Sequence, residues 1–301
     1  MSRIHEALKK AEQERAMSQP SREAAPSVMD APVEPAGVYT SAAVATAAPA
    51  LSSAPESLLA RCRQTHWTPD PKTMLFFSAD EHAAGMEEFR TLRSRLYQAR
   101  EKHPLSKLLV TSALPKEGKT FTAANLGQVI VRQHGRRVLL IDADLRNPQL
   151  HNALGAEPGP GLSEYLRSES DEFSVIQRGP MENLFFIPAG VNTGNPAELL
   201  ANGRLKFLLS RLETMFDWII VDSAPAVPVA DAALLANFCD GVLLVVRSNS
   251  TPVDAARKAR KEFADRNVVG VVLNGINPEL SPYSQYYYAA YGSEPKAEAK
   301  N

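Results

Sequence analysis

The sequence predicts an α/β fold in which a mostly parallel, twisted sheet carries helices on both faces. From residue 105 onward, short segments rich in Val, Ile and Leu alternate with helical segments. These apolar segments lack the polar alternation of a half-exposed strand, which indicates strands covered on both faces, as in a parallel sheet. A chain of 301 residues with 44% hydrophobic content is also long enough for one large α/β domain with extensions.

The composition narrows the class of protein. Because 33 basic residues balance 34 acidic residues, nucleic acid is not an expected partner. The two cysteines, Cys62 and Cys239, cannot build a disulfide framework or a metal-binding knuckle, which favours a reducing compartment. The sequence contains neither an apolar run of about 18 residues nor a signal-peptide pattern. We therefore expect a cytoplasmic protein.

Two segments precede the predicted domain. Residues 1–15 predict an amphipathic helix with four apolar residues at helical spacing: Ile4, Ala7, Leu8 and Ala11. Such a helix either frays as a leader or docks on a partner or a membrane. Residues 16–72 are rich in Ala, Pro and Ser, which predicts a disordered linker. The folded domain is then expected over residues 73–280, followed by a C-terminal tail over residues 281–301.

The first helix of the domain is predicted over residues 80–101. Phe89, Leu92 and Leu96 form one apolar stripe, and several arginines crowd its flanks. This pattern favours a salt-bridged helix that lies on the domain. Six strands are expected after it, at 107–111, 138–142, 184–188, 218–222, 241–247 and 268–274, and a helix over residues 121–132 follows the first strand.

A phosphate-binding loop follows the first predicted strand. The pattern is a small residue, four free positions and then Gly-Lys-Thr, with Ala113 in place of the usual first glycine. In such a loop, backbone N–H groups surround the β-phosphate, Lys119 reaches the β and γ oxygens, and the Thr120 hydroxyl ligates Mg²⁺. The sequence thus predicts a P-loop NTPase that uses ATP and Mg²⁺. The residues expected to contact the nucleotide are Ala113, Leu114, Pro115, Lys116, Glu117, Gly118, Lys119, Thr120 and Phe121.

Carboxylates end two of the other predicted strands. Asp142 ends one strand with Asp144 two residues further on, and Asp222 ends another, so all three are expected near the phosphate loop. We predict Lys119 and these three aspartates as catalytic residues, with Asp142 as the proton acceptor or a direct metal contact. The predicted metal ligands are Thr120, Asp142 and Asp222, and Arg146 is expected to orient the acidic pair.

Two further features leave alternatives open. Asn274 ends the last predicted strand, where it either contacts the nucleotide base or forms a turn with Gly275. Lys258, Arg260 and Lys261 lie on one helix; a solvated basic face explains them, and contact with an activator or an acidic lipid is the alternative.

The C-terminal tail holds five of the eight tyrosines of the chain: Tyr283, Tyr286, Tyr287, Tyr288 and Tyr291. Three consecutive aromatic residues cannot share one face of a regular element, and the flanking Pro, Ser and Gly indicate a mobile tail. A platform for single-stranded nucleic acid would need interleaved basic residues, which residues 278–293 lack. A tail that packs on its own domain is the other alternative.

Together these motifs resemble the bacterial tyrosine kinases, the capsule and exopolysaccharide tyrosine autokinases. Residues 112–120 resemble their first Walker motif, residues 140–146 their second acidic motif, and residues 219–225 their Walker B motif. The resemblance extends through residues 161–166, residues 195–200 and the tyrosine tail, so it covers about residues 80–292. It implies an ATP-dependent protein-tyrosine kinase that phosphorylates its own tail tyrosines.

The resemblance also implies partners. Residues 88–96 are similar to the helix by which these kinases assemble into rings, which makes Glu88, Arg90 and Arg93 interface residues, although Arg95 replaces a usual Asn. Residues 1–11 resemble the leader of the exosortase-associated subgroup, which lacks a fused membrane domain. A separate membrane polysaccharide co-polymerase or chain-length determinant protein is then expected to recruit and activate the kinase, and a tyrosine phosphatase to counteract it.

Two rival functions use the same motifs. A MinD/ParA-like ATPase would hydrolyse ATP at this site, but its extra signature lysine would stand where Leu114 stands. A non-catalytic adaptor of the polysaccharide machinery would bind ATP and transfer nothing, which the three retained aspartates argue against. Lys116, where the resembled family often has Gly, has no explanation in the sequence.

Overall fold

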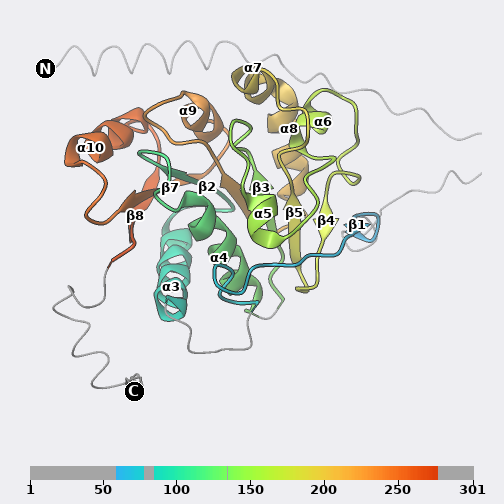
Figure 1. The fold of residues 1–301 in the computed structure, drawn as a ribbon, viewed down its shortest axis with the longest axis horizontal. Helices are drawn as coiled ribbons and strands as arrows, with labels where there is room; N and C mark the ends of the chain where they lie inside the picture. The colour runs from blue at the N-terminus through green and yellow to red at the C-terminus, as the bar shows by residue number, and fades with distance from the viewer. Residues whose placement is uncertain (1–58, 78–84, 134, 277–301) are drawn as a thin grey trace, which may run out of the picture. The chain divides into compact units, whose positions relative to one another are not determined.

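The computed structural model describes residues 59–77, 85–133 and 135–276 (Figure 1). The predicted N-terminal helix, most of the predicted linker and the tyrosine tail lie outside these residues. The described residues all belong to one compact unit of the chain.

An eight-stranded sheet forms the centre of the described part, in the order β1-β4-β5-β3-β6-β2-β7-β8. All strand pairs are parallel except β4 with β5. The predicted mostly parallel sheet is therefore confirmed. The strands are β1 (Arg63–Gln64), β2 (Lys107–Ser112), β3 (Val138–Asp142), β4 (Gln177–Arg178), β5 (Leu184–Ile187), β6 (Trp218–Asp222), β7 (Gly241–Arg247) and β8 (Val268–Asn274).

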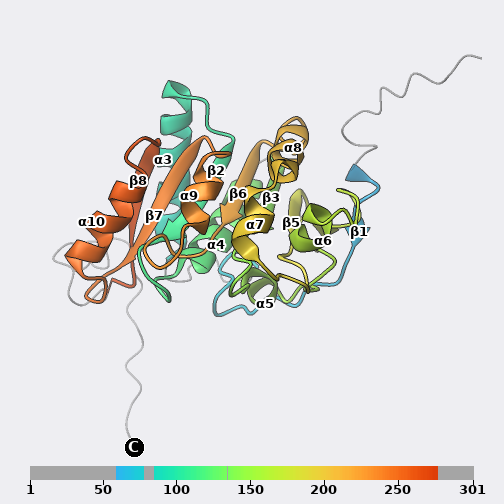
Figure 2. The ribbon, with the colours of Figure 1, turned by 90° about the horizontal axis from the view of Figure 1, so that it is seen from above.

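Helices cover both faces of the sheet. The first face carries α3 (Met86–Lys102), α4 (Lys119–Val131) and α5 (Leu150–Leu154). The other face carries α6 (Leu162–Leu166), α7 (Pro196–Ala201), α8 (Gly203–Leu212), α9 (Asp231–Ala236) and α10 (Val253–Glu262). Seen from above, α6 lies toward the β1 end of the sheet and α10 beside β8 at the opposite end (Figure 2).

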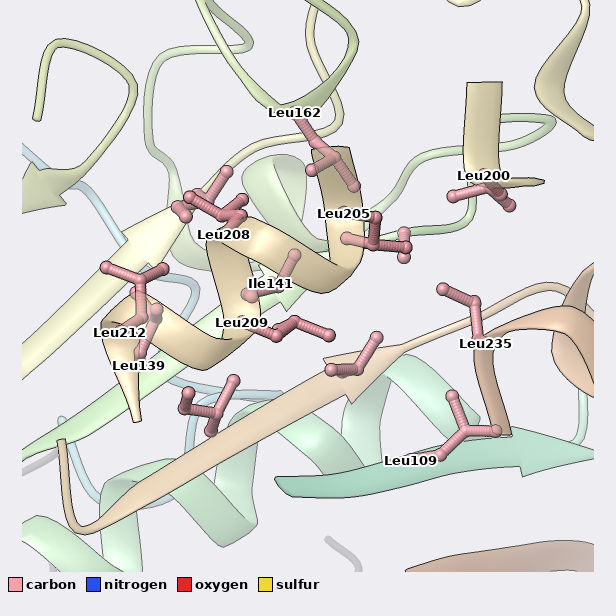
Figure 3. Close-up of a cluster of buried hydrophobic side chains, with 14 of the residues drawn as sticks. Leu109, Leu139, Ile141, Leu162, Leu200, Leu205, Leu208, Leu209, Leu212 and Leu235 are labelled. Carbon is pink, nitrogen blue, oxygen red and sulfur yellow. The ribbon is translucent and has the colours of Figure 1, made fainter. Parts of the chain in front are cut away.

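Two separate apolar cores explain why the strands show no polar alternation. Successive strand residues point to opposite faces, so Leu109 joins one core while Leu108 and Val110 join the other. Figure 3 shows the core on the α8 face, where Leu205 and Leu209 of the helix pack over the strands. Because both faces are covered, both sets of strand residues must be apolar.

The predicted linker ends earlier than its sequence suggested. Residues 59–72 were predicted to be disordered, but they belong to the fold: β1 pairs with β4, and Leu59, Cys62 and Trp67 are buried. The Trp67 indole donates a 2.9 Å hydrogen bond to the Thr65 hydroxyl, which in turn donates to Gln177 at 3.1 Å. This segment contains few apolar residues, but its large ones are buried in the fold. The average composition of the segment does not show this burial.

The structure refines the other boundaries by a few residues. The helix predicted over 80–101 is described from Met86 to Lys102, and the helix predicted over 121–132 begins two residues earlier, at Lys119. Across the described ranges, none of the helices has both the length and the hydropathy needed to cross a membrane.

Candidate active site

The order of the strands brings the predicted motifs to one edge of the sheet. β3, β6 and β2 are neighbours and parallel, so the acidic ends of β3 and β6 lie beside the phosphate loop that follows β2. Asp142 and Asp222 are register partners on β3 and β6. The predicted clustering of the motifs is a direct result of this topology.

The phosphate loop is supported by Asn274, the residue that ends the last strand, β8. Gly118 precedes α4 with a φ of 94°, a left-handed conformation that glycine adopts readily. A Cβ on Gly118 would lie 2.0 Å from Nδ2 of Asn274. The same Asn274 amide donates a 2.9 Å hydrogen bond to the carbonyl oxygen of Glu117. Asn274 therefore holds the phosphate loop, while its contact with a nucleotide base stays a prediction.

The Glu117 side chain stabilises the phosphate loop through hydrogen bonds. Its carboxylate is buried and accepts a 2.8 Å hydrogen bond from the Leu114 backbone N–H. It also accepts a hydrogen bond from the Thr251 hydroxyl, which belongs to the segment after β7. The loop is thus held in shape by contacts within the protein. Thr251 was missed at the sequence level because a lone Thr in a connecting segment carries no motif.

Lys116 now has a conformational explanation. Its φ is 66°, in the left-handed region where glycine is favoured, and its side chain is exposed. Arg247 donates a 3.1 Å hydrogen bond to the Lys116 carbonyl oxygen and so helps to hold this turn. The turn itself, and no side-chain contact, is what makes glycine suitable at this position.

The phosphate loop and the aspartates make direct contact. The Lys119 ammonium lies 2.8 Å from Oδ2 of Asp144, and the Thr120 hydroxyl donates a 2.6 Å hydrogen bond to Oδ2 of Asp222. Asp142 accepts two backbone hydrogen bonds, from Asp144 at 3.2 Å and from Leu150 at 3.0 Å. The structure therefore brings together all four residues predicted as catalytic.

Burial and mutual repulsion shift the pKa values of these groups. Asp142 and Asp222 have no exposed surface, and burial raises the pKa of Asp222 to about 6, although the Lys119 charge opposes this shift. Burial and the neighbouring Asp222 charge raise the pKa of Asp142 well above its ordinary value. Burial alone would lower the pKa of Lys119, but the charges of Asp222 and Asp144 outweigh it and raise that pKa. The site therefore concentrates negative charge around one lysine.

The residues present fit a magnesium ion. Oδ1 of Asp222 is buried and makes no well-formed hydrogen bond with any described residue, although its partner oxygen binds Thr120. A free carboxylate oxygen beside a hydroxyl is the oxygen donor set that Mg²⁺ prefers, together with phosphate and water. Asp142 fits less directly, because both of its oxygens already accept backbone N–H groups.

The expected role of Arg146 is wrong. Its guanidinium forms a two-pronged ion pair with Asp231, at 2.7 and 2.9 Å, and makes no hydrogen bond to Asp142 or Asp144. Asp231 is fully buried at the start of α9. The pair ties the loop after β3 to α9, and the sequence contained no signal for it beyond an acidic residue at a helix start.

The residues predicted for an oligomer interface lie on α3. Glu88 is exposed, and Arg90 pairs with Glu87 one turn away at 2.9 Å. Arg93 donates a 2.9 Å hydrogen bond to the Val129 carbonyl oxygen near the end of α4. Arg93 therefore has a contact within its own chain. The five tail tyrosines lie outside the described residues.

This chain is similar to a family of nucleotide-binding domains and to bacterial tyrosine-protein kinases. The family described as "CobQ/CobB/MinD/ParA nucleotide binding domain" matches residues 109–290. Tyrosine-protein kinase YwqD of Bacillus subtilis (strain 168) is 37% identical over 210 residues, which cover 69% of this chain and 86% of YwqD. Tyrosine-protein kinase etk of Escherichia coli (strain K12) is 35% identical over 227 residues, which cover 74% of this chain but 31% of etk.

The solved structures agree with these relatives. The kinase domain of the Escherichia coli tyrosine kinase ETK superposes with a TM-score of 0.63 at 33% identity, covering 67% of this chain and 80% of that domain. The P-loop fold predicted from the sequence is thereby confirmed, and so is the family resemblance; membership of the exosortase-associated subgroup stays a prediction. This chain belongs to the bacterial tyrosine-protein kinases, which are built on the CobQ/CobB/MinD/ParA type of nucleotide-binding domain.

Proposed function

We propose that this chain transfers the γ-phosphoryl group of ATP to tyrosines of its own C-terminal tail, on a neighbouring subunit. The observation that carries the proposal is the contact of Lys119 with Asp144 and of Thr120 with Asp222 at one phosphate loop. The acceptors are Tyr283, Tyr286, Tyr287, Tyr288 and Tyr291. They follow β8, whose last residue Asn274 supports that same loop.

Each residue of the site has a separate task in this proposal. The loop N–H groups and Lys119 offset charge on the transferring phosphoryl group. A free tyrosine hydroxyl has a pKa near 10, so it needs a proton acceptor at neutral pH. Asp142 is our candidate for this acceptor, because burial and the Asp222 charge raise its pKa. Asp144 holds the Lys119 ammonium at the loop before the nucleotide arrives.

Thr120 and Asp222 would hold Mg²⁺, with Asp142 beside them. The chemistry supplied by a bound Mg²⁺ would be positive charge that offsets the charge developing on the phosphoryl group.

Tail phosphorylation would act as an assembly switch. Each phosphate adds nearly two negative charges, so a phosphorylated tail is repelled by an acidic site and loosens a ring of subunits. We place Glu88, Arg90 and Arg93 at the interface of that ring. In this proposal the kinase is cytoplasmic, a membrane polysaccharide co-polymerase recruits and activates it, and a tyrosine phosphatase reverses it. The switch would couple the kinase to the synthesis, length or export of an exopolysaccharide.

The test is phosphotyrosine detection after incubation with ATP and Mg²⁺. Lys119→Met should abolish the signal, because the lysine that reaches the β and γ oxygens is lost. Lys206→Met, which removes an exposed lysine on α8, should leave the signal unchanged. Replacing the five tail tyrosines by Phe should remove most of the signal. Full phosphotyrosine in Lys119→Met would overturn the mechanism.

The same experiment separates the two rival functions. The family that matches this chain includes the MinD and ParA type of ATPase, so ATP hydrolysis without phosphotyrosine would favour such an activity. Nucleotide binding with neither hydrolysis nor phosphotyrosine would favour a nucleotide-gated adaptor.

A further inference from the structure

A groove of about 620 Å³ lies between α10 and the strands β7 and β8, at one end of the sheet. Its floor is apolar and consists of Leu244 and Val246 from β7 and Val271 and Leu273 from β8. Val271 is 58% exposed and Leu273 is 53% exposed. Figures 1 and 2 both place α10 beside β8, which is the last strand of the sheet.

The groove exists because α10 covers this end of the sheet incompletely. Among the residues of α10, only Ala259 is buried. Ala256 lines the groove without filling it, and no strand is described beyond β8. Two large apolar side chains on β8 are therefore left open to solvent on the face that the other helices cover.

The rim of the groove is strongly basic. Arg257, Arg260 and Lys261 of α10 line one side, and Arg247 lines the end near the phosphate loop. Arg257 pairs with Asp254 at 3.6 Å, but Asp254 is almost fully exposed, so it neutralises little of this charge. An apolar floor with a cationic rim suits a ligand that carries an anionic group next to an aromatic ring.

We propose that this groove binds the phosphorylated tyrosines of the chain's own C-terminal tail. The proposal rests on the proposed function, which supplies the phosphate. A phosphotyrosine ring would cover part of the apolar floor, and its phosphate, with a charge of about −1.5 to −2, would pair with the arginines of the rim. An unmodified tyrosine offers the ring without the charge.

The C-terminal tail is long enough to reach the groove of its own chain. Leu273 in the floor is only three residues before Ile276, the last described residue, and Tyr283 follows seven residues later. Seven residues reach up to about 25 Å when extended, so the first tail tyrosine can return to the groove beside its own strand. Tethering on one chain gives an effective concentration on the order of mM, which compensates for a weak site.

The groove lies beside the phosphate loop, and this position determines what binding of the tail would do. Arg247 lines the groove and also donates to the Lys116 carbonyl oxygen of the phosphate loop. A tail held in the groove is therefore next to the active site but outside it, so its phosphates are stored away from the acidic residues. The groove would keep the reaction product from re-entering the site and would shield it from a phosphatase.

The first experiment does not depend on kinase activity. A fluorescent peptide of residues 280–292 with phosphates on Tyr286, Tyr287 and Tyr288 is titrated into the unphosphorylated full chain and followed by anisotropy. We expect saturable binding that weakens at least tenfold in Arg257→Ala/Arg260→Ala and at least tenfold for the unphosphorylated peptide. The control Lys206→Ala/Lys258→Ala removes the same charge from exposed positions outside the groove lining and should change binding less than twofold.

Three results of the peptide titration would overturn the proposal. The first is equal binding of the two peptides, and the second is equal loss in the double variant and its control. The third is displacement of the phosphopeptide by ADP, which would place it in the nucleotide site. Vesicles of phosphatidylglycerol test the other anionic surface: binding to vesicles that needs Arg257 and Arg260, without binding of the phosphopeptide, would assign the rim to a membrane.

A second experiment tests the storage role on the phosphorylated full chain. A general tyrosine phosphatase should remove tail phosphate at least threefold faster from Arg257→Ala/Arg260→Ala than from the wild type or the Lys206→Ala/Lys258→Ala control. Equal rates would show that the groove does not shield the tail. If no phosphotyrosine forms on any of the proteins, the proposed kinase function fails, while the peptide titration still decides whether the groove binds phosphotyrosine.

Discussion

At the scale of single residues, the structure explains Lys116 by its backbone. Its φ of 66° places an L-residue in a region that costs about 1–2 kcal/mol relative to the right-handed one. Glycine avoids this cost but loses more entropy on folding, by about 0.5–1 kcal/mol. A sequence pattern shows which residue is unusual at a position, but it does not show the dihedral angle that makes it so.

We expect Lys116→Gly to raise the free energy of unfolding by about 0.5–1 kcal/mol, because the left-handed strain is lost. The measurement is urea unfolding followed by circular dichroism. Lys258→Gly is the matched control: Lys258 lies within α10, where glycine should lower the free energy of unfolding by about 1 kcal/mol. A loss of stability in Lys116→Gly would contradict this explanation of the turn.

Glu164 is a second residue whose importance lies in its backbone contacts. Its carboxylate accepts backbone hydrogen bonds from Gly161 at 2.7 Å, Val191 at 3.1 Å and Asn192 at 3.2 Å. Burial alone would raise the pKa of Glu164, but these hydrogen bonds outweigh it and lower that pKa. The ionised carboxylate therefore stabilises the junction between α6 and the segment after β5.

Glu164→Gln should lower the free energy of unfolding by about 1–3 kcal/mol at pH 7, because a neutral amide accepts these bonds less well. Since the pKa is lowered in the folded state, the contribution of Glu164 is complete above its ordinary value near 4.5 and is lost as the pH falls through the folded pKa. The difference between wild type and variant in urea unfolding should therefore shrink below pH 4.5. A difference that grows toward low pH would refute the assignment.

At the scale of elements, long apolar strands were predictable and short edge elements were not. The bounds of β3, β6, β7 and β8 agree with the apolar segments of the sequence. In β3 and β6 both faces are buried and demand apolar residues, whereas β8 at the end of the sheet is only partly buried and is recognised by its Val and Leu content. β1 and β4 have two residues each, too few to show any periodicity. Their pairing depends on partners more than 100 residues apart, which no local pattern records.

Mutation can separate the contact of α3 within its own chain from its proposed role in assembly. Arg93 donates to the Val129 carbonyl oxygen, whereas Glu88 is exposed. Arg93→Ala should lower the free energy of unfolding by about 1 kcal/mol and weaken assembly, while Glu88→Lys should weaken assembly and change stability by less than about 0.5 kcal/mol. Urea unfolding gives the first quantity and sedimentation velocity the second. Unchanged sedimentation of both variants would remove α3 from the proposed interface.

At the scale of the whole molecule, the topology builds the candidate site. The sequence predicted the phosphate loop and the three aspartates because each lies at or just after the end of an apolar strand, and the parallel order β3-β6-β2 brings them together. The pairing of Arg146 with Asp231 and the support of the loop by Thr251 and Asn274 could not be predicted. They join segments that only the folded sheet makes neighbours.

Binding of nucleotide to this site should stabilise the whole molecule. At a concentration one hundred times its dissociation constant, Mg·ADP should add about 2.7 kcal/mol to the free energy of unfolding. Chelation of Mg²⁺ by EDTA should reduce this gain, and Asp222→Asn should make the gain independent of Mg²⁺, because Oδ1 of Asp222 is the free donor. Thermal unfolding with ADP, with and without EDTA, measures both effects. An equal gain with EDTA in the wild type would argue against a metal at Asp222.

The support of the phosphate loop by Asn274 determines when the nucleotide site can form during protein synthesis. The hydrogen bond between Asn274 and Glu117 joins positions 157 residues apart in the chain. At a synthesis rate of 5–20 residues per second, the ribosome makes Asn274 on the order of 10 s after the loop. During that interval the loop lacks the strand that supports it, so a nascent chain acquires its finished nucleotide site only after β8 has been made.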